Sequence, residues 1–220
     1  MKLGYSKLFT YTMGAALTWS VVSLVQTPPS LLDAFFVAFF TVFTTDLISG
    51  LLHVILDNPR SLEVGAIKGL AEGFQRHHDK PSSIYEMPLY QHLYVMHMPL
   101  TLFFLVVVPF HESLMYVVFI SMCASLHLMQ MAHLWAHLPP QELPGVVRAL
   151  QKARILLSKP QHDKHHTAPY EKDHCIMTGM CNPVLNLATK TFGGTSHWWN
   201  AAFLAAALSP LAVAFGLSLT

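Results

Sequence analysis

Histidine is the residue type that stands out in this sequence, with 14 among 220 residues. Eight of these histidines fall into four short groups along the chain. Residues four apart on a helix share one face, so two histidines at that spacing can approach the same ion. Neutral imidazole is a common ligand of Zn, Fe, Cu and Ni, and eight imidazoles are more than one ion needs. The sequence therefore predicts two metal ions, with these candidate ligands: His53, His77, His78, His133, His137, His162, His165 and His166.

Carboxylate and amide side chains accompany these histidines. Asp46 and Asp57 lie on the same helical stripe as His53. Carboxylates often orient a metal-bound imidazole through its second ring nitrogen, so we expect both aspartates to act in this way. Two amides next to the other histidine groups, Gln75 and Gln130, are expected to contact the metal ligands without binding the metal themselves.

The composition places these residues in a membrane protein. The chain is 53% hydrophobic and 11% charged, with a mean hydropathy of +0.42, whereas soluble domains carry about 25% charged residues. A net charge of +1 gives no basic field for a nucleic acid. Three cysteines, Cys123, Cys175 and Cys181, support neither a disulfide framework nor a thiolate metal site. At this length we expect one domain over residues 1–220.

Five apolar runs are long enough to be tested as membrane spans, since a hydrocarbon layer of about 30 Å needs about 20 residues in a helix. The first follows Lys2 and Lys7 like a signal peptide, but it lacks a small-residue cleavage site, so we expect it to be retained. The last contains Pro210 and either spans the membrane or lies partly in its interface. The sequence thus predicts an all-α protein with four or five transmembrane helices, at residues 8–26, 31–56, 93–110, 114–135 and 198–219.

Basic residues predict the orientation of these spans. All 13 Lys and Arg residues lie at the N-terminus or in the two long loops, so the positive-inside rule places these parts, and the histidine groups beside them, on the cytoplasmic side. Two amphipathic segments, at residues 62–74 and 143–157, are expected to be helices on the membrane surface. The pattern suits a bacterial inner membrane, an endoplasmic reticulum or a plastid membrane equally.

The depth of the four histidine groups in the membrane distinguishes them from isolated histidines. From residue 31 to His53 a helix rises about 33 Å, which places the metal ions at the cytoplasmic boundary of the hydrocarbon layer. Polar groups at membrane depth are costly and tend to mark function. A lone histidine is more often a hydrogen-bonded core or surface residue, and this interpretation suits His111 and His127.

Four chemistries compete for such a site. A zinc metalloprotease needs Glu after the first histidine of its helical motif, and Leu134 stands there. A haem protein needs only two axial ligands, and a metal transporter places its ligands near the membrane midplane. A non-haem iron oxygenase acting on an alkyl chain fits the ligand count and the membrane location best.

The histidine-containing stretches together resemble the Kua/CarF-like lipid desaturase family, which includes plasmanylethanolamine desaturase and a plant plastid fatty acid desaturase. The resemblance covers about residues 45–187, with similar order and spacing. The stretches that carry it are Asp46 to His53, Phe74 to His78 with Pro81, Gln130 to His137, His162 to His166 with Pro169, and Cys175 to Gly179.

The sequence also departs from the family pattern. Val54 replaces an aromatic residue, and residues 90–93 replace a stretch that contains Asn. This leaves open whether His92 is an added ligand. His97 is expected either to lie in the core or to contact a metal ligand without binding metal. His174 stands at a position expected to be aromatic, so it is left out of the ligand set.

The resemblance implies a di-iron centre held by the eight candidate ligands. With O2 as co-substrate, such a centre removes two hydrogens from neighbouring carbons of a lipid chain near the head group, converting a plasmanyl ether to a vinyl ether or desaturating an acyl lipid. A hydroxylase of the same chemistry, or a non-enzymatic metal or haem protein, stays as an alternative. Nothing in the sequence points to the residues that bind the substrate.

Each turnover would consume two electrons, and the sequence has no nucleotide-binding, haem-attachment or ferredoxin motif. We therefore expect an external donor of the cytochrome b5 or ferredoxin type. A basic loop with Arg148, Lys152, Arg154 and Lys159 could bind such an acidic carrier, or equally anionic lipid head groups.

Overall fold

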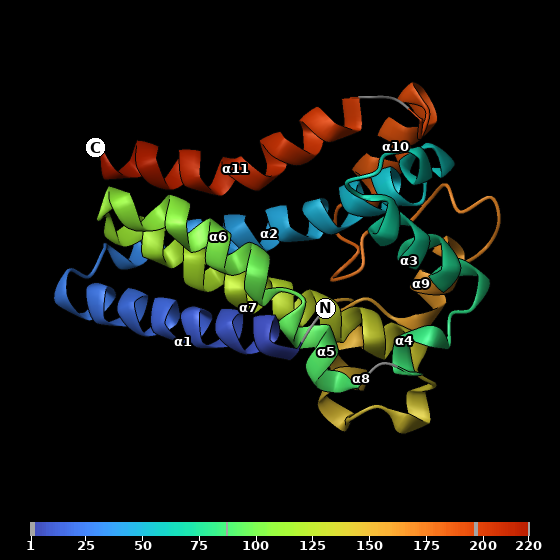
Figure 1. The fold of residues 1–220 in the computed structure, drawn as a ribbon, viewed down its shortest axis with the longest axis horizontal. Coiled ribbons are helices and arrows are strands. Elements are labelled where there is room, and N and C mark those ends of the chain that lie inside the picture. The colour runs from blue at the N-terminus through green and yellow to red at the C-terminus, as the bar shows by residue number, and fades with distance from the viewer. Residues whose placement is uncertain (1–2, 87, 196–197, 220) are drawn as a thin grey trace. The chain divides into compact units, whose positions relative to one another are not determined.

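The computed structural model describes residues 3–86, 88–195 and 198–219. Within these ranges every regular element is a helix and no strand occurs, so the all-α prediction is confirmed. Short 3-10 turns lie at Pro59–Glu63 (η1), Val108–Phe110 (η2) and Pro140–Glu142 (η3). The α-helices, labelled in Figure 1, are α1 Leu3–Gln26, α2 Leu31–Leu56, α3 Lys68–Asp79, α4 Ser83–Glu86, α5 Leu89–Tyr94, α6 His97–Val107, α7 Ser113–His137, α8 Gly145–Lys152, α9 Lys159–His165, α10 Asn182–Phe192 and α11 Trp198–Ser218.

Within the described ranges, five helical segments are long and apolar enough to cross a membrane, in agreement with the predicted four or five. The fifth is continuous through Pro210. The side of the membrane on which each end lies stays a prediction. The five segments are Lys7–Gln26, Leu31–Leu56, Leu89–Phe110, Ser113–His137 and Trp198–Ser218.

The third of these segments is not one uninterrupted helix, which the apolar run alone did not predict. A turn at Val95 and Met96 separates α5 from α6. Pro99 explains the turn, because it has no N–H to donate to the carbonyl of Val95 and its ring would clash with that carbonyl in a continuous helix.

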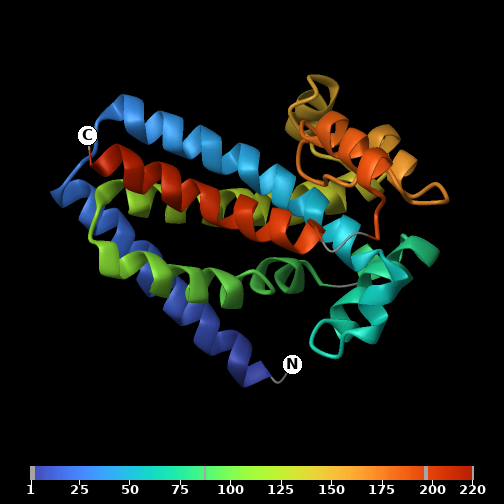
Figure 2. The same ribbon diagram turned by 90° about the horizontal axis from the view of Figure 1, so that it is seen from above.

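The chain divides into two compact units. Unit 1 comprises Met1–Thr44, Pro88–His127 and Leu208–Thr220, and unit 2 comprises Thr45–Met87 and Leu128–Ala207. In unit 1, α1 packs against α5 and α6, and Figure 2 shows α1 and α6 from above. All eight candidate histidine ligands belong to unit 2. The prediction that residues 1–220 form a single functional domain stays a prediction.

The two predicted amphipathic helices are shorter than their patterns suggested. In the first, the chain forms η1, a turn and then α3, so only the latter part of residues 62–74 is α-helical. In the second, α8 ends at Lys152 because Arg154 adopts a left-handed conformation with φ of 59°. Leu156 and Leu157 therefore reach the core of unit 2 from a loop instead of from a helix face.

Candidate metal centre

Three helices of unit 2 bring five histidines together. His77 comes from α3, His133 and His137 from α7, and His162 from α9, with His166 directly after α9. Each offers one ring nitrogen, and these nitrogens all lie within 4.8 Å of one another. We call these residues the five-histidine group.

The spacing of the nitrogens in the five-histidine group suits a shared ion. The Nε2 atom of His137 lies 2.9 Å from that of His77, 2.9 Å from that of His162 and 3.2 Å from that of His133. Imidazole nitrogens bind Zn²⁺ at about 2.0–2.1 Å, and neighbouring ligands at that distance from one ion lie about 2.8–3.4 Å apart, from octahedral to tetrahedral angles. The ring nitrogens are thus placed as ligands on one coordination sphere would be.

A second group combines a carboxyl group with two imidazoles. Asp57 Oδ1 lies 3.6 Å from His78 Nε2, and Asp57 Oδ2 lies 3.3 Å from His165 Nε2. We call these three residues the aspartate group. Asp57 was expected to orient an imidazole, but the structure places it where it could bind metal directly.

Unpaired atoms in the aspartate group indicate that it suits a cation. His165 Nδ1 contacts the backbone oxygen of Lys172 at 3.0 Å, so Nδ1 carries the proton and donates it to that oxygen. In the neutral ring, His165 Nε2 then faces Asp57 with a lone pair. Both carboxyl oxygens and His165 Nε2 are buried and have no hydrogen-bond partner in the described chain. A metal ion would satisfy all three atoms, and buried polar groups are rarely left without a partner.

His53 lies beside both groups. Its ring centroid is 5.9 Å from that of His133 and 5.2 Å from that of His165. His53 Nδ1 donates to the backbone oxygen of Ser49 at 2.9 Å, which leaves Nε2 free to bind metal. The two groups also adjoin at His78 and His166, whose ring centroids are 4.9 Å apart. The structure therefore brings seven of the eight candidate histidines into two adjacent groups and places the eighth, His53, beside both.

The local sequence explains how α9 and the residue after it supply three of these histidines on one side. Residues 162, 165 and 166 have the spacing that places side chains on one helix face. Ser158 and Gln161 form a reciprocal capping box at the start of α9, and Pro160 lies in its first turn. These features favour a short helix with a fixed start.

Burial and mutual repulsion keep several members of the five-histidine group neutral. Burial lowers the pKa of His77 to about 4, with a further contribution from His78. Burial, followed by repulsion from His137, lowers the pKa of His166 to about 2, and the pKa of His162 also lies well below its ordinary value for the same reasons. Neutral imidazoles have lone pairs available for a metal ion at neutral pH.

The pH dependence of stability follows from these lowered pKa values. We expect the metal-free protein to lose stability as the pH falls from about 6.5 towards about 4, because the unfolded chain binds protons that the folded groups do not accept. Thermal unfolding of metal-free protein across this range would show it. A constant unfolding temperature would contradict the neutral, buried state of these rings.

Asp46 has a different role from the one that the sequence predicted. Its Oδ1 accepts hydrogen bonds from the backbone N–H of Thr178 at 2.8 Å and of Gly179 at 3.2 Å, and its Oδ2 accepts one from Cys181 at 3.0 Å. The expectation that Asp46 orients the His53 ring is wrong, since the Ser49 backbone oxygen holds that ring. Asp46 instead fixes the loop before α10 against α2.

Replacing Asp46 by Asn tests this assignment. The amide keeps one acceptor oxygen but turns an N–H2 group toward at least one backbone N–H, which leaves a buried donor unpaired. We expect a loss of about 1–3 kcal/mol in the free energy of unfolding, measured by denaturant titration. The control is Asp33→Asn in the first turn of α2, and an equal effect of both variants would contradict the assignment.

Gly50 is a packing position. A Cβ there would lie 2.5 Å from Leu185 Cδ2 and 2.6 Å from Cys175 Sγ, closer than atoms can approach. The two contacting side chains come from α10 and from the loop before it, which are distant from Gly50 in the sequence.

The remaining predicted residues lie in several places. Gln75 Nε2 donates to the backbone oxygens of Leu56 and Asn58, at 3.1 and 3.2 Å, so it caps the end of α2, and its predicted support of a ligand stays a prediction. Gln130 is half-buried one turn before His133, and its role stays a prediction. His92 is buried in unit 1, and its role as an added ligand also stays a prediction.

Three histidines outside the predicted ligand set have clear environments. In unit 1, His97 contacts Thr10 Oγ1 through Nδ1 at 2.9 Å, and His127 Nδ1 donates to the Cys123 backbone oxygen at 2.6 Å. His174 is buried in unit 2 with its ring centroid 5.0 Å from that of His165. The sequence pattern gave no sign of this contact, because it depends on the fold of the loop after α9.

Comparison with known proteins identifies the family of this chain. The family model for the lipid desaturase domain matches residues 42–201. Fatty acid desaturase 4 of Arabidopsis thaliana is 31% identical over 142 residues, which are 64% of this chain and 44% of that protein. Fatty acid desaturase 4-like 2 of the same plant is 33% identical over 143 residues, 64% of this chain and 51% of that protein.

A bacterial relative matches a shorter stretch. Plasmanylethanolamine desaturase of Myxococcus xanthus is 36% identical over 55 residues, which are 25% of this chain and 19% of that protein. The chain spans about half the length of the plant relatives or less. No solved structure matches this chain. Because the family model covers most of the sequence, including every histidine of the two groups, this chain belongs to the lipid desaturase family.

Proposed function

We propose that this protein is an O2-dependent membrane desaturase that holds two iron ions and forms a double bond in a lipid alkyl or acyl chain. The observation that carries the proposal is the pair of adjacent groups of buried ligands, one of five histidines and one of Asp57, His78 and His165. Five candidate membrane spans in the same chain suit a substrate dissolved in the bilayer.

The donor set favours iron. Imidazole and carboxylate suit several divalent metals, but desaturation needs a redox-active one, and family membership points to that reaction. When bound, two irons would supply O2 activation and the removal of two hydrogens. The chain would hold the rings rigidly and exclude water, and the side chains of His162 and His165 are fully buried.

The nitrogen spacing argues against haem as the alternative cofactor. Axial ligands on opposite sides of a haem iron lie about 4 Å apart, twice a bond of about 2.0 Å, with the flat macrocycle between them. The Nε2 atoms around His137 lie at 2.9–3.2 Å instead. Edge-to-face ring contacts of 4.6 Å between His137 and both His77 and His162 leave no flat slot there.

The relatives define the range of substrates to test. The plant relatives are named as fatty acid desaturases, and the bacterial relative as a plasmanylethanolamine desaturase. An acyl lipid and an ether lipid are therefore the two substrate classes. The position of His53 about 33 Å along α2 supports attack near the head group. Electrons would come from an external carrier of the cytochrome b5 or ferredoxin type.

Lipid analysis of cells with and without the gene tests the proposal. We expect a lipid that lacks two hydrogens relative to its precursor only in cells that express the active chain, and not in cells that express His165→Ala. A gain of one oxygen would identify a hydroxylase. A double bond that also forms with the His165→Ala variant would overturn the mechanism.

A further inference from the structure

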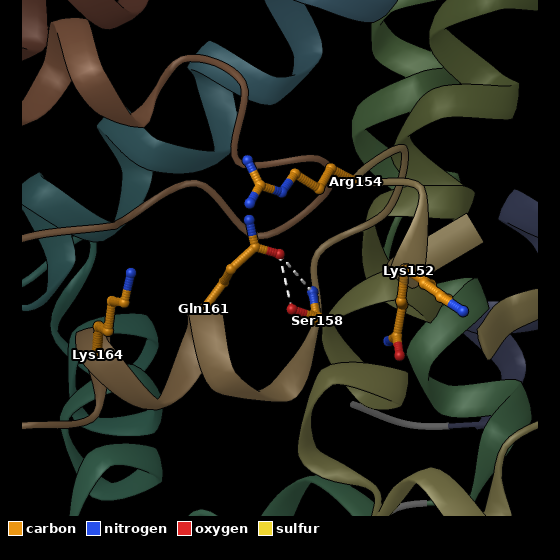
Figure 3. A pocket seen from close by; sticks show the side chains of 6 residues that line it. Lys152, Arg154, Ser158, Gln161 and Lys164 are labelled. Atoms are coloured by element: carbon orange, nitrogen blue, oxygen red, sulfur yellow. Dashed lines mark hydrogen bonds between the residues drawn. The ribbon is translucent and has the colours of Figure 1, made fainter. Parts of the chain in front are cut away.

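A polar pocket lies in unit 2 outside the two ligand groups. It has a volume of about 360 Å³ and is formed by the end of α8, the following loop and α9 (Figure 3). The residues that line it are Gln151, Lys152, Arg154, Ser158, Gln161 and Lys164.

Three cations line this pocket without an acidic partner. Lys152, Arg154 and Lys164 are exposed, and none of them forms an ion pair within the described ranges of the chain. Lys159, by contrast, contacts Asp163 at 2.8 Å. Arg148, the other cation of the predicted basic loop, reaches the backbone oxygen of Pro140 and does not line the pocket.

The amide of Gln161 adds a hydrogen-bond donor. Its Oε1 accepts from the backbone N–H of Ser158 at 3.1 Å and from the Ser158 hydroxyl at 2.7 Å. Those two bonds fix which end of the amide is oxygen. The Nε2 group therefore points the other way, and Figure 3 shows it turned toward the Arg154 guanidinium. Two donors that face each other cannot bond to each other, but an anion between them would accept from both.

Arg154 occupies a backbone position that usually belongs to glycine. After α8 its N–H bonds to the oxygen of Gln151 at 3.0 Å, and the N–H of Ile155 bonds to that of Leu150 at 2.9 Å. This pattern is a Schellman motif, in which the left-handed residue is most often Gly. Arg154 takes that conformation with φ of 59°, which is unfavourable for a residue with a Cβ atom. The Arg154 guanidinium therefore lines the pocket although its backbone conformation is strained.

We propose that this pocket binds the phosphate group of a membrane lipid head group. Three cations and the Gln161 amide supply charge-assisted and neutral hydrogen bonds to phosphate oxygens. Val146 and Ile155 nearby are 67% and 56% exposed, as expected for a surface that meets the bilayer interface. The pocket is concave and of head-group size, whereas a carrier protein would need a broader surface. The same helix α9 supplies Gln161 and Lys164 to the pocket and His162 and His165 to the ligand groups.

The test uses the full chain in an uncharged detergent. Dihexanoyl phosphatidic acid, its chain-free counterpart glycerol 3-phosphate, and inorganic phosphate are each titrated, and the rise in unfolding temperature gives the dissociation constant. We expect phosphatidic acid to bind at least about tenfold more tightly than the two chain-free probes, because its acyl chains add apolar contacts. The metal ions are not needed for this binding, so it can fail while the proposed function stands.

Arg154→Gly is the decisive variant. We expect it to weaken phosphatidic acid binding at least about tenfold, because one charge-assisted contact is lost, while the unliganded protein unfolds at the same or a higher temperature, because Gly suits the left-handed turn. Lys190→Ala removes an exposed cation from α10 and should leave binding unchanged.

The other outcomes overturn the proposal in distinguishable ways. Equal affinity for phosphatidic acid and glycerol 3-phosphate would identify a soluble phosphate compound as the ligand. Binding of an acidic ferredoxin that Arg154→Gly abolishes, without binding of any phosphate probe, would identify a docking site for an electron carrier. Binding of phosphatidic acid that Arg154→Gly leaves intact would place the lipid elsewhere.

Discussion

Replacing His137 by Ala is expected to abolish desaturation and to remove one of the two metal ions. His137 lies at the centre of the five-histidine group, with its Nε2 2.9 Å from the Nε2 atoms of both His77 and His162. Loss of a residue that merely supports a ligand already lowers metal affinity or activity by about 10–100-fold. Loss of this ligand should therefore lower activity by more than about 100-fold.

Metal content and lipid products measure this effect together. We expect purified His137→Ala protein to carry one iron per chain and the unchanged protein to carry two. His127→Ala is the matched control, because His127 lies on the same helix α7 and donates to a backbone oxygen instead of joining either group. Two irons in His137→Ala, or a similar loss in His127→Ala, would show that the five-histidine group does not hold an ion.

The sequence alone could predict which histidines meet, because their helical spacing and the family resemblance act over short stretches. His133 and His137 share a face of α7 by periodicity, and residues 162, 165 and 166 share a face of α9. The apolar runs likewise predicted the five spans, because length and hydropathy decide that a segment can cross a bilayer. These predictions needed no knowledge of which elements pack together.

The two aspartates show where such reasoning stops. In the sequence pattern Asp46 and Asp57 lie on the same helical stripe as His53. In the structure, however, Asp46 accepts three backbone N–H groups and Asp57 faces His78 and His165. The difference comes from the loop before α10, which folds back onto α2 at Asp46 and leaves Asp57 without such donors. Helical periodicity contains no information on that long-range contact.

The backbone groups that orient the imidazole rings could not be predicted from the sequence either. The Ser49 and Lys172 carbonyl oxygens accept from His53 and His165, and any residue type could supply them. A carboxylate was expected in that role because only side chains can be read from residue types. Pro99 shows the opposite case, since its effect on α6 follows directly from its chemistry.

Asp57→Asn should separate the stability of the folded chain from its capacity to bind metal. In the metal-free protein both Asp57 oxygens are buried and have no hydrogen-bond partner in the described residues. Burying such a group without a partner costs about 1–3 kcal/mol. Asn has nearly the same shape and cannot carry the charge, so the metal-free variant should unfold at a higher temperature than the metal-free unchanged chain.

The metal-bound comparison should run in the opposite direction. Without its only carboxylate the aspartate group offers two imidazoles alone, and we expect iron content to fall from two ions to one and desaturation to be lost. Asp163→Asn is the control, because Asp163 pairs with Lys159 on the exposed side of α9. If Asp57→Asn kept both irons, the carboxyl group would be a structural partner of His78 and His165 and not a ligand. If Asp57→Asn also destabilised the metal-free chain, His78 and His165 would be donating hydrogen bonds to Asp57. Their ring nitrogens would then lack the lone pairs that a cation needs.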